Sequence, residues 1–203
     1  MNKRMWAYLR RSIGVASVVA ATALVAGCGG SVEGTAAAAD TAATSSSSSA
    51  APSTVAGQQG SDRGGSVDID VAIGDCVRLG GTSDAATIAE AKCGSDKSNY
   101  KVVAKATKNA QCPSDVDQVY YETRWGTERG ALCLDVDWVM GGCMTVPDGE
   151  DEPQRVACND PHAPRIERAV EIIEGVTDVE QCSEGGFVHD ERRFTVCTET
   201  VSG

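Results

Sequence analysis

Cysteines are the side chains whose number and spacing could do the most chemistry in this chain. Nine occur among 203 residues, and no two of them form a Cys-x-x-Cys pair. Only two histidines, His162 and His189, could join them as metal ligands. Structural zinc sites usually contain close cysteine pairs, so the spacing favours disulfides over metal binding. Nine is an odd number, and one cysteine must therefore serve another purpose.

The first cysteine, Cys28, lies in different surroundings from the others. It follows an uncharged apolar run, residues 13–26, which is preceded by four basic residues: Lys3, Arg4, Arg10 and Arg11. A run of 14 residues is shorter than the ~20 that a membrane-spanning helix needs and is typical of an export signal. Val25-Ala26-Gly27-Cys28 resembles the lipobox of bacterial lipoproteins. The resemblance implies that residues 1–27 are a signal peptide and that Cys28 is the lipidation site, acylated with palmitate and anchored in the cell membrane.

The composition changes directly after Cys28. Residues 29–66 are mostly Ala, Ser, Gly and Thr, with no aromatic residue. Such a tract buries too little apolar surface to offset the entropy of ordering it. We therefore expect residues 28–66 to be a lipidated N-terminus and a disordered linker, spanning on the order of 35 Å.

The net charge excludes some partners. Without the four basic residues of the signal, the chain has 29 acidic and 14 basic residues, a formal net charge of −15. Nucleic acid and anionic lipid repel such a surface, so we expect no nucleic-acid partner and expect the lipid on Cys28 to provide the membrane contact. A basic envelope protein or a wall component remains a candidate partner.

The remaining eight cysteines occur in two similar halves. Each half opens with a Gly-x-Cys or Gly-Gly-Cys segment, reaches a second cysteine after a strand-like run, continues to Gln-Cys, and closes on an apolar strand with a fourth cysteine. The separations are 17, 19 and 21 residues in the first half and 15, 24 and 15 in the second. This order predicts a tandem duplication, with repeat 1 at residues 67–139 and repeat 2 at residues 140–203.

Two stretches carry a resemblance to a known family. Gly74-Asp75-Cys76, and Cys158-Asn159-Asp160-Pro161-His162 in the second half, resemble the septum-formation-like domain of actinobacterial envelope proteins. The segments from Cys93 to Asp117 and from Ala131 to Met144 look like LppU-family lipoproteins. The resemblance implies a lipid-anchored protein on the extracytoplasmic face of the cell membrane, and it brings no catalytic residue with it.

The local sequence predicts an α+β fold of two tandem, small, disulfide-stapled modules. Residues 76–79 and 87–93 should form a hairpin, and residues 100–107 and 131–138 should be strands. Residues 114–123 begin with a capping-box-like Ser-Asp-Val-Asp and predict a short helix. Residues 166–173 fit either a strand or a helix by spacing, and their correspondence with 100–107 favours a strand.

The duplication also predicts the disulfide pairing. A duplicated unit should close its bonds within itself, and cysteines at the open ends of a hairpin approach bridging distance. We therefore predict four bonds: Cys76–Cys93, Cys112–Cys133, Cys143–Cys158 and Cys182–Cys197.

The charged motifs give no clear active site. Asp135-Val136-Asp137 resembles the start of a calcium loop but lacks the glycine and glutamate of an EF-hand, and strand alternation predicts both carboxylates on one solvent-exposed face. We therefore predict no metal site. Neither histidine stands in a catalytic motif, and no Gly-x-Ser-x-Gly or phosphate-binding glycine pattern occurs. The sequence thus predicts a binding or scaffolding protein that is not an enzyme and has no cofactor, with a cell-wall hydrolase as the alternative.

Overall fold

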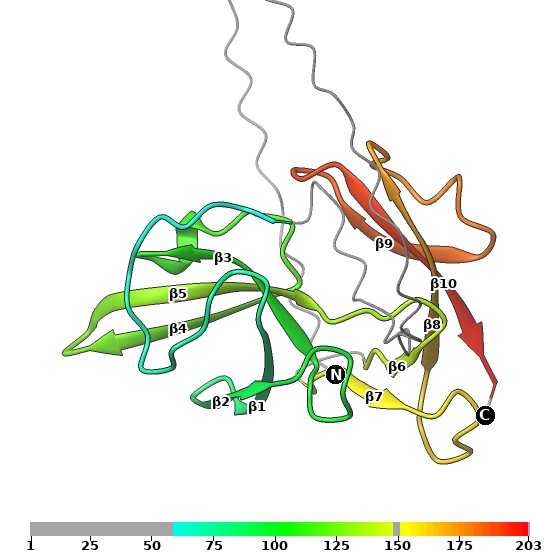
Figure 1. The fold of residues 1–203 in the computed structure, drawn as a ribbon, viewed down its shortest axis with the longest axis horizontal. Coiled ribbons are helices and arrows are strands. Elements are labelled where there is room, and N and C mark those ends of the chain that lie inside the picture. Colours follow the sequence, from blue (N-terminus) through cyan, green and yellow to red (C-terminus); the bar gives the residue numbers. More distant parts are fainter. Residues whose placement is uncertain (1–58, 148–150, 203) are drawn as a thin grey trace, which may run out of the picture. The chain divides into compact units, whose positions relative to one another are not determined.

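A computed structural model describes residues 59–147 and 151–202 of the chain. The predicted signal peptide, Cys28 and most of the predicted linker lie outside the described residues. The described part consists of two five-stranded antiparallel sheets, one in each half of the sequence (Figure 1). We call them module 1 and module 2.

Module 1 is a curved sheet in which the strands stand in the order β2-β1-β3-β5-β4. Its first two strands form a hairpin whose turn is at Ser83 and Asp84, so the strands extend further toward the turn than the sequence predicts. The central position belongs to β3, which pairs with β1 on one side and with β5 on the other. The elements are β1 (Cys76–Thr82), β2 (Ala85–Ala91), β3 (Tyr100–Ala106), the 3-10 turn η1 (Asn109–Gln111), β4 (Gln118–Arg124) and β5 (Thr127–Val136).

Module 2 repeats this topology strand for strand. Its order is β7-β6-β8-β10-β9, which is the order of module 1 with five added to each number. Residues 166–173 are a strand, as the correspondence between the halves predicts. The elements are β6 (Cys143–Thr145), β7 (Gln154–Val156), β8 (Ile166–Glu174), β9 (Gly185–His189) and β10 (Phe194–Val201).

Four disulfides occupy equivalent places in the two modules. One in each module joins the start of the first strand to a cysteine two residues after the second strand. The other joins the last strand to the segment before its hairpin partner. The bonds are Cys76–Cys93, Cys112–Cys133, Cys143–Cys158 and Cys182–Cys197, which are the four predicted pairs. The shared strand order and bond pattern support two similar modules.

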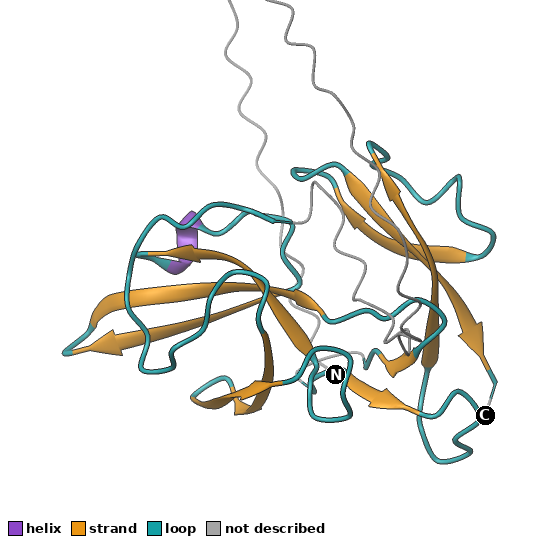
Figure 2. Cartoon of the chain, in the orientation of Figure 1, coloured by secondary structure: helices purple, strands orange, loops and turns teal. Residues whose placement is uncertain are grey.

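The predicted helix over residues 114–123 is wrong, and the fold is mainly β rather than α+β. Residues 118–124 form strand β4, and Figure 2 shows one short helical turn at η1. Val119, Tyr120 and Tyr121 favour an extended backbone, and pairing with β5 completes the ladder. Ser114, read as a helix cap, instead donates its N–H (2.6 Å) and its hydroxyl (2.9 Å) to the carboxylate of Glu191 in module 2.

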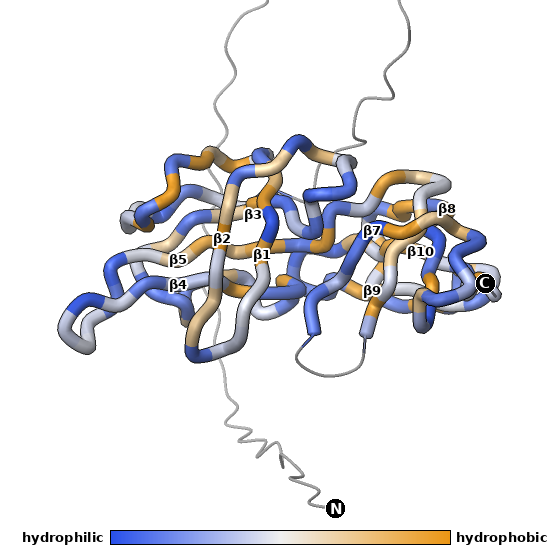
Figure 3. Tube along the Cα trace, turned by 90° about the horizontal axis from the view of Figure 1, so that it is seen from below, coloured by the Kyte–Doolittle hydropathy of each residue, from blue (hydrophilic) through white to orange (hydrophobic). Residues whose placement is uncertain are grey.

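The hydrophobic core lies mostly in module 1. Strand β5 is buried from residue 130 to its end, because its two faces contact different clusters. Leu132, Leu134 and Val136 belong to the larger cluster, and Ala131 and Cys133 belong to a smaller one on the other face. Figure 3 shows the inner part of β5 as hydrophobic, whereas its end at the β4–β5 turn is hydrophilic and much of the edge strand β4 is pale.

The folded part includes residues before the predicted linker boundary at residue 66. The N–H of Gly60 donates to Val103 O (2.7 Å), and the N–H of Ser66 donates to Arg129 O (3.0 Å). Gly65 has a φ of 89°, and a Cβ there would lie 2.3 Å from Ala106 O. Only glycine allows this close approach, so the last residues of the expected linker belong to the folded part.

Candidate functional site

The two modules share one hydrophobic core where they meet, which we call the seam. Met144, Ala169, Phe194 and Val196 of module 2 belong to the same buried cluster as the core of module 1. Trp138, just after β5, packs against Phe187 of β9 with the ring centroids 5.4 Å apart. The seam is thus a continuous apolar contact, and it brings several charged residues of the two modules together.

The centre of the seam is Arg192, from the loop between β9 and β10. Its guanidinium lies between two carboxylates of module 1: Nε is 2.8 Å from Asp115 Oδ1, and NH1 is 2.6 Å from Asp135 Oδ2. NH2 also donates to Asp135 Oδ1 (2.9 Å) and to Asp115 O (2.9 Å). The three side chains are 2–6 % exposed, so water screens these charges weakly.

His189 completes this buried cluster. It is 1 % exposed, and its ring stacks on Phe194 with the centroids 4.2 Å apart. Its Nδ1 lies 2.8 Å from Asp115 O and 2.9 Å from Arg192 NH2. His189 therefore packs as a structural residue between the strands of module 2 and the loop that carries Asp115.

The pKa values of the two carboxylates that bind Arg192 are shifted in opposite directions. Burial tends to raise the pKa of Asp115, but hydrogen bonds and the charge of Arg192 outweigh burial and hold it below its ordinary value. Burial raises the pKa of Asp135 above its ordinary value, although Arg192 opposes that shift. Burial lowers the pKa of Arg192, but both aspartates raise it further, so the cation persists at any ordinary pH.

A second arginine of module 2 binds the neighbouring aspartate. Arg155 NH2 lies 3.2 Å from Asp137 Oδ2 and also donates to Asp137 O, while its Nε donates to Ser95 O (3.3 Å). Asp137 is completely buried, and its Oδ2 also accepts from Ser98 Oγ (2.7 Å) and from Gly94 N–H (2.6 Å). Each aspartate of the Asp135-Val136-Asp137 motif therefore holds an arginine of the other module.

The predicted solvent exposure of this motif is wrong, because both carboxylates are buried. Alternation does place Asp135 and Asp137 on one face, but that face also carries Cys133 of a disulfide. Because disulfide cysteines are usually buried, Cys133 on the same face could have indicated that the two carboxylates are buried. Sequence reasoning missed Arg155, Arg192 and Asp115 altogether, because their partners come from the other repeat.

A groove opens along the seam, which we call the seam groove. It encloses about 600 Å³ between β1 of module 1 and the loops of module 2, and its lining includes Arg78, Gly81, Asp160 and His162. Tyr100 O–H donates to Glu152 at its edge (2.5 Å), and burial and this carboxylate raise the pKa of Tyr100 strongly. Of the two histidines considered from sequence, His162 is exposed and lines this groove, whereas His189 is buried.

A second groove, the hairpin groove, lies between β4 and the β1–β2 hairpin. It encloses about 570 Å³ and is lined by residues 79–86 on one side and by Gln118, Val119, Tyr120 and Tyr121 on the other. Glu152 lines both grooves, as do Leu79, Gly80 and Gly81. The two grooves therefore adjoin each other at the end of β1.

The described residues contain one group with the composition of a metal site. Ligand atoms of Cys76, Cys93 and Asp137 lie within 4.8 Å of one another. The two sulfurs are joined in a disulfide, so neither is a thiolate that could bind a metal. The helical structure in residues 59–147 and 151–202 lacks the length and apolar character that crossing a membrane requires.

No family model, curated protein or solved structure matches this chain. The arguments about function that follow therefore rest on the residues and on their geometry.

Proposed function

We propose that this chain is a non-catalytic binding module of the bacterial cell envelope, tethered to the membrane by lipid on Cys28. Four disulfides are typical of proteins in an oxidising, extracytoplasmic space. The lipobox-like sequence and the resemblance to LppU-family lipoproteins support the anchor and the envelope location.

The observation that carries the proposal is the use of the buried charges. Arg155, Arg192, Asp115, Asp135 and Asp137 bind one another across the seam. A catalytic site needs converging titratable groups at a cavity. The five buried charged residues instead form ion pairs that hold the two modules together. The seam groove and the hairpin groove are open and carry acidic residues, and both suit recognition of a partner.

The test uses crosslinking in intact cells, with Cys28→Ser as the first variant. We expect Cys28→Ser to release the protein from membranes and to reduce capture of a membrane-bound partner. Charge reversal at exposed acidic residues of the two grooves, Asp84→Lys with Asp151→Lys, should abolish capture, and capture by the parent should weaken as salt rises. Unchanged fractionation of Cys28→Ser with membranes would overturn the anchor.

The hydrolase alternative is tested at His162. His189 is unsuitable, because its buried ring supports the fold and its loss would inactivate either kind of protein. We expect His162→Ala to keep full in-cell function. If His162→Ala folds with its four disulfides and behaves as a null, the binding proposal fails and the hydrolase takes its place.

A further inference from the structure

Strand β4 is an edge strand, and the hydrogen bonds around β5 show which of its backbone groups face outward. Val136 N–H donates to Asp117 just before β4 (2.8 Å), and Asp137 N–H donates to Asn99 O just before β3 (2.9 Å). Alternation then directs Leu134 and Leu132 toward β4, where they pair with Gln118 and Tyr120. The alternate residues of β4, Val119 and Tyr121, therefore direct their N–H and C=O groups away from β5.

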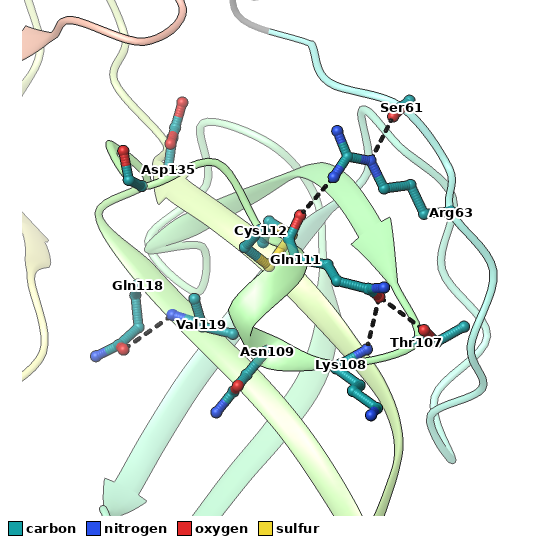
Figure 4. Close-up of a disulfide and its surroundings, with 12 residues drawn as sticks. Ser61, Arg63, Thr107, Lys108, Asn109, Gln111, Cys112, Gln118, Val119 and Asp135 are labelled. Carbon is teal, nitrogen blue, oxygen red and sulfur yellow. Dashed lines mark hydrogen bonds between the residues drawn. A yellow bond between two sulfur atoms is a disulfide. The ribbon is translucent and has the colours of Figure 1, made fainter. Parts of the chain in front are cut away.

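One of these outward groups is bound by a side chain of the same strand. Val119 N–H donates to Gln118 Oε1 (2.9 Å), as Figure 4 shows. A carbonyl oxygen of a paired strand would occupy the same place. The side chain of Gln118 thus supplies the contact that a neighbouring strand would otherwise make.

The space on this side of β4 is the hairpin groove. Its opposite wall has small side chains or none, at Gly80, Gly81, Ala85 and Ala86. Its volume of about 570 Å³ lies within the ~300–1,000 Å³ typical of ligand sites. A main chain placed about 4.8 Å from β4 would therefore find room for its own side chains.

The charge of the groove selects among extended chains. The charged residues that line it are Asp84 and Glu152, and both are acidic. Tyr120 and Tyr121 add aromatic rings, and Tyr121 is among the most exposed large hydrophobic residues of the described part. A second copy of this acidic chain would bring like charges together, whereas a basic peptide would be attracted.

We propose that the hairpin groove binds an extended peptide segment with basic side chains, which adds to β4 as a further strand. Main-chain hydrogen bonds to Val119 and Tyr121 supply affinity, and the carboxylates of Asp84 and Glu152 select lysine or arginine. This inference rests on the proposed binding function and names its partner class. It assigns recognition to the edge of module 1.

The probe is a blocked hexapeptide of alternating lysine and valine, with a glutamate–valine peptide as its counterpart. Binding to the isotope-labelled full chain is followed by amide chemical shifts. We expect the lysine peptide to shift the amides of residues 118–123 and 80–86, and we expect the glutamate peptide to leave them unchanged. Shifts confined to the seam groove, or equal binding of both peptides, would overturn the proposal.

Three variants test the geometry. Val119→Pro removes the outward N–H but no bond to β5, and it should weaken binding about tenfold. Gln118→Ala removes the competing side chain and should tighten binding about threefold, which a merely damaged fold would not do. Asp84→Asn should weaken binding of the lysine peptide about threefold, whereas Asp96→Asn, the same change at an exposed site outside the groove, should not.

The outcomes separate this inference from the proposed function. If cells still yield a crosslinked partner while Val119→Pro binds the peptide as the parent does, the groove inference is wrong and the binding function stands. If Gln118→Ala fails to tighten binding, strand addition is wrong. If the chain dimerises without peptide and Val119→Pro abolishes the dimer, a second copy is the occupant and the peptide inference falls.

Discussion

Modules 1 and 2 have the same strand order and the same disulfide pattern, but they are stabilised differently. Of the buried hydrophobic residues in the described part, fifteen belong to module 1 and seven to module 2. Strand β3 is buried at six of its seven residues, whereas its counterpart β8 is buried at only two of nine, Ile166 and Ala169. Module 2 therefore depends more on its disulfides and on its contacts with module 1.

The β4–β5 hairpin of module 1 and the β9–β10 hairpin of module 2 also differ in how far their turns are buried. In module 2 the loop between β9 and β10 carries Arg192, which is buried against module 1. In module 1 the corresponding turn, Trp125-Gly126, presents a tryptophan that is 92 % exposed. The turn before the last strand thus binds the other module in module 2 and is exposed to solvent in module 1.

Removing the guanidinium of Arg192 should have the largest effect on the free energy of unfolding. Arg192→Met leaves Asp115 and Asp135 buried without a cation and should lower the free energy of unfolding by about 3–5 kcal/mol. Hydrogen exchange should show that β6 to β10 lose more protection than β1 to β5. Arg193→Met changes an exposed neighbour and should alter stability by only about 0.5 kcal/mol. Equal unfolding midpoints for the two variants in denaturant would refute the role of Arg192.

Removing equivalent disulfides should sharpen the difference between the cores. Substitution of Cys182 and Cys197 by alanine, or of Cys112 and Cys133, should cost about 2–4 kcal/mol in either module. Hydrogen exchange should differ between the two pairs. We expect β9 and β10 to open locally in the first variant, whereas β3 and β5 stay protected in the second because the core around Leu132 and Leu134 remains. Global unfolding in both variants would contradict this difference.

The seam should respond to acid in a direction set by Asp115. Because the folded pKa of Asp115 lies below its unfolded value of about 3.9, its contribution is present above that value and is lost as pH falls through the folded pKa. Asp115→Asn should therefore flatten the loss of stability below about pH 4. Asp135, whose pKa is raised, acts in the opposite sense and at higher pH: its protonation between the raised folded pKa and about pH 4 favours the folded state. Asp135→Asn should therefore steepen the loss of stability just above about pH 4. Denaturant unfolding at a series of pH values measures both slopes, and parallel slopes would refute the assignment.

The exposed turn should give the smallest effect, and a favourable one. Trp125 has a φ of 52°, a left-handed conformation that favours asparagine or glycine in a two-residue hairpin turn. Trp125→Asn should raise the free energy of unfolding by about 0.5–1 kcal/mol, measured by thermal unfolding. Trp125→Ala, which gains no such tolerance, should not stabilise the protein. A destabilised asparagine variant would show that the stacking of Arg124 on Trp125 outweighs the strain.

The repeat pattern of the cysteines made the fold accessible from sequence. It gave the two modules, the four disulfide pairs and the strand at residues 166–173. The helix predicted for residues 114–123 failed because Ser114 bonds to Glu191 and because β5 completes strand β4. Local signals compete with pairing partners that lie distant in sequence, and the partners prevailed here.

The candidate site was less accessible for the same reason. The sequence pattern singles out Asp135 and Asp137, but an aspartate in an apolar strand does not indicate which arginine forms an ion pair with it. Arg155 and Arg192 come from the other repeat, 18 and 57 residues away from their aspartates. The hairpin groove is lined by β4 and by the β1–β2 hairpin, which stand at opposite ends of the strand order, and no residue pattern specifies that they approach each other.

The exposed tip at Trp125 also bears on how the duplicated modules assemble. In a two-fold dimer each contact is reciprocated, so the hairpin of module 1 would lie against the end of β10 as the hairpin of module 2 lies against the end of β5. Its tip is exposed instead, so the modules join head to tail. In such an interface one contact surface of each kind remains unoccupied, so further copies could add to it and form a fibre.

The corresponding end of module 2 carries other residues at the positions that bind Arg192 and Arg155 in module 1. Counted from the last cysteine of each module, Glu199 replaces Asp135 and Val201 replaces Asp137. Glu199 is already paired with Arg168 of its own module (2.5 Å). At these positions module 2 therefore lacks the two buried aspartates with which module 1 binds Arg192 and Arg155, and the tip of module 1 at Trp125 lies exposed to solvent.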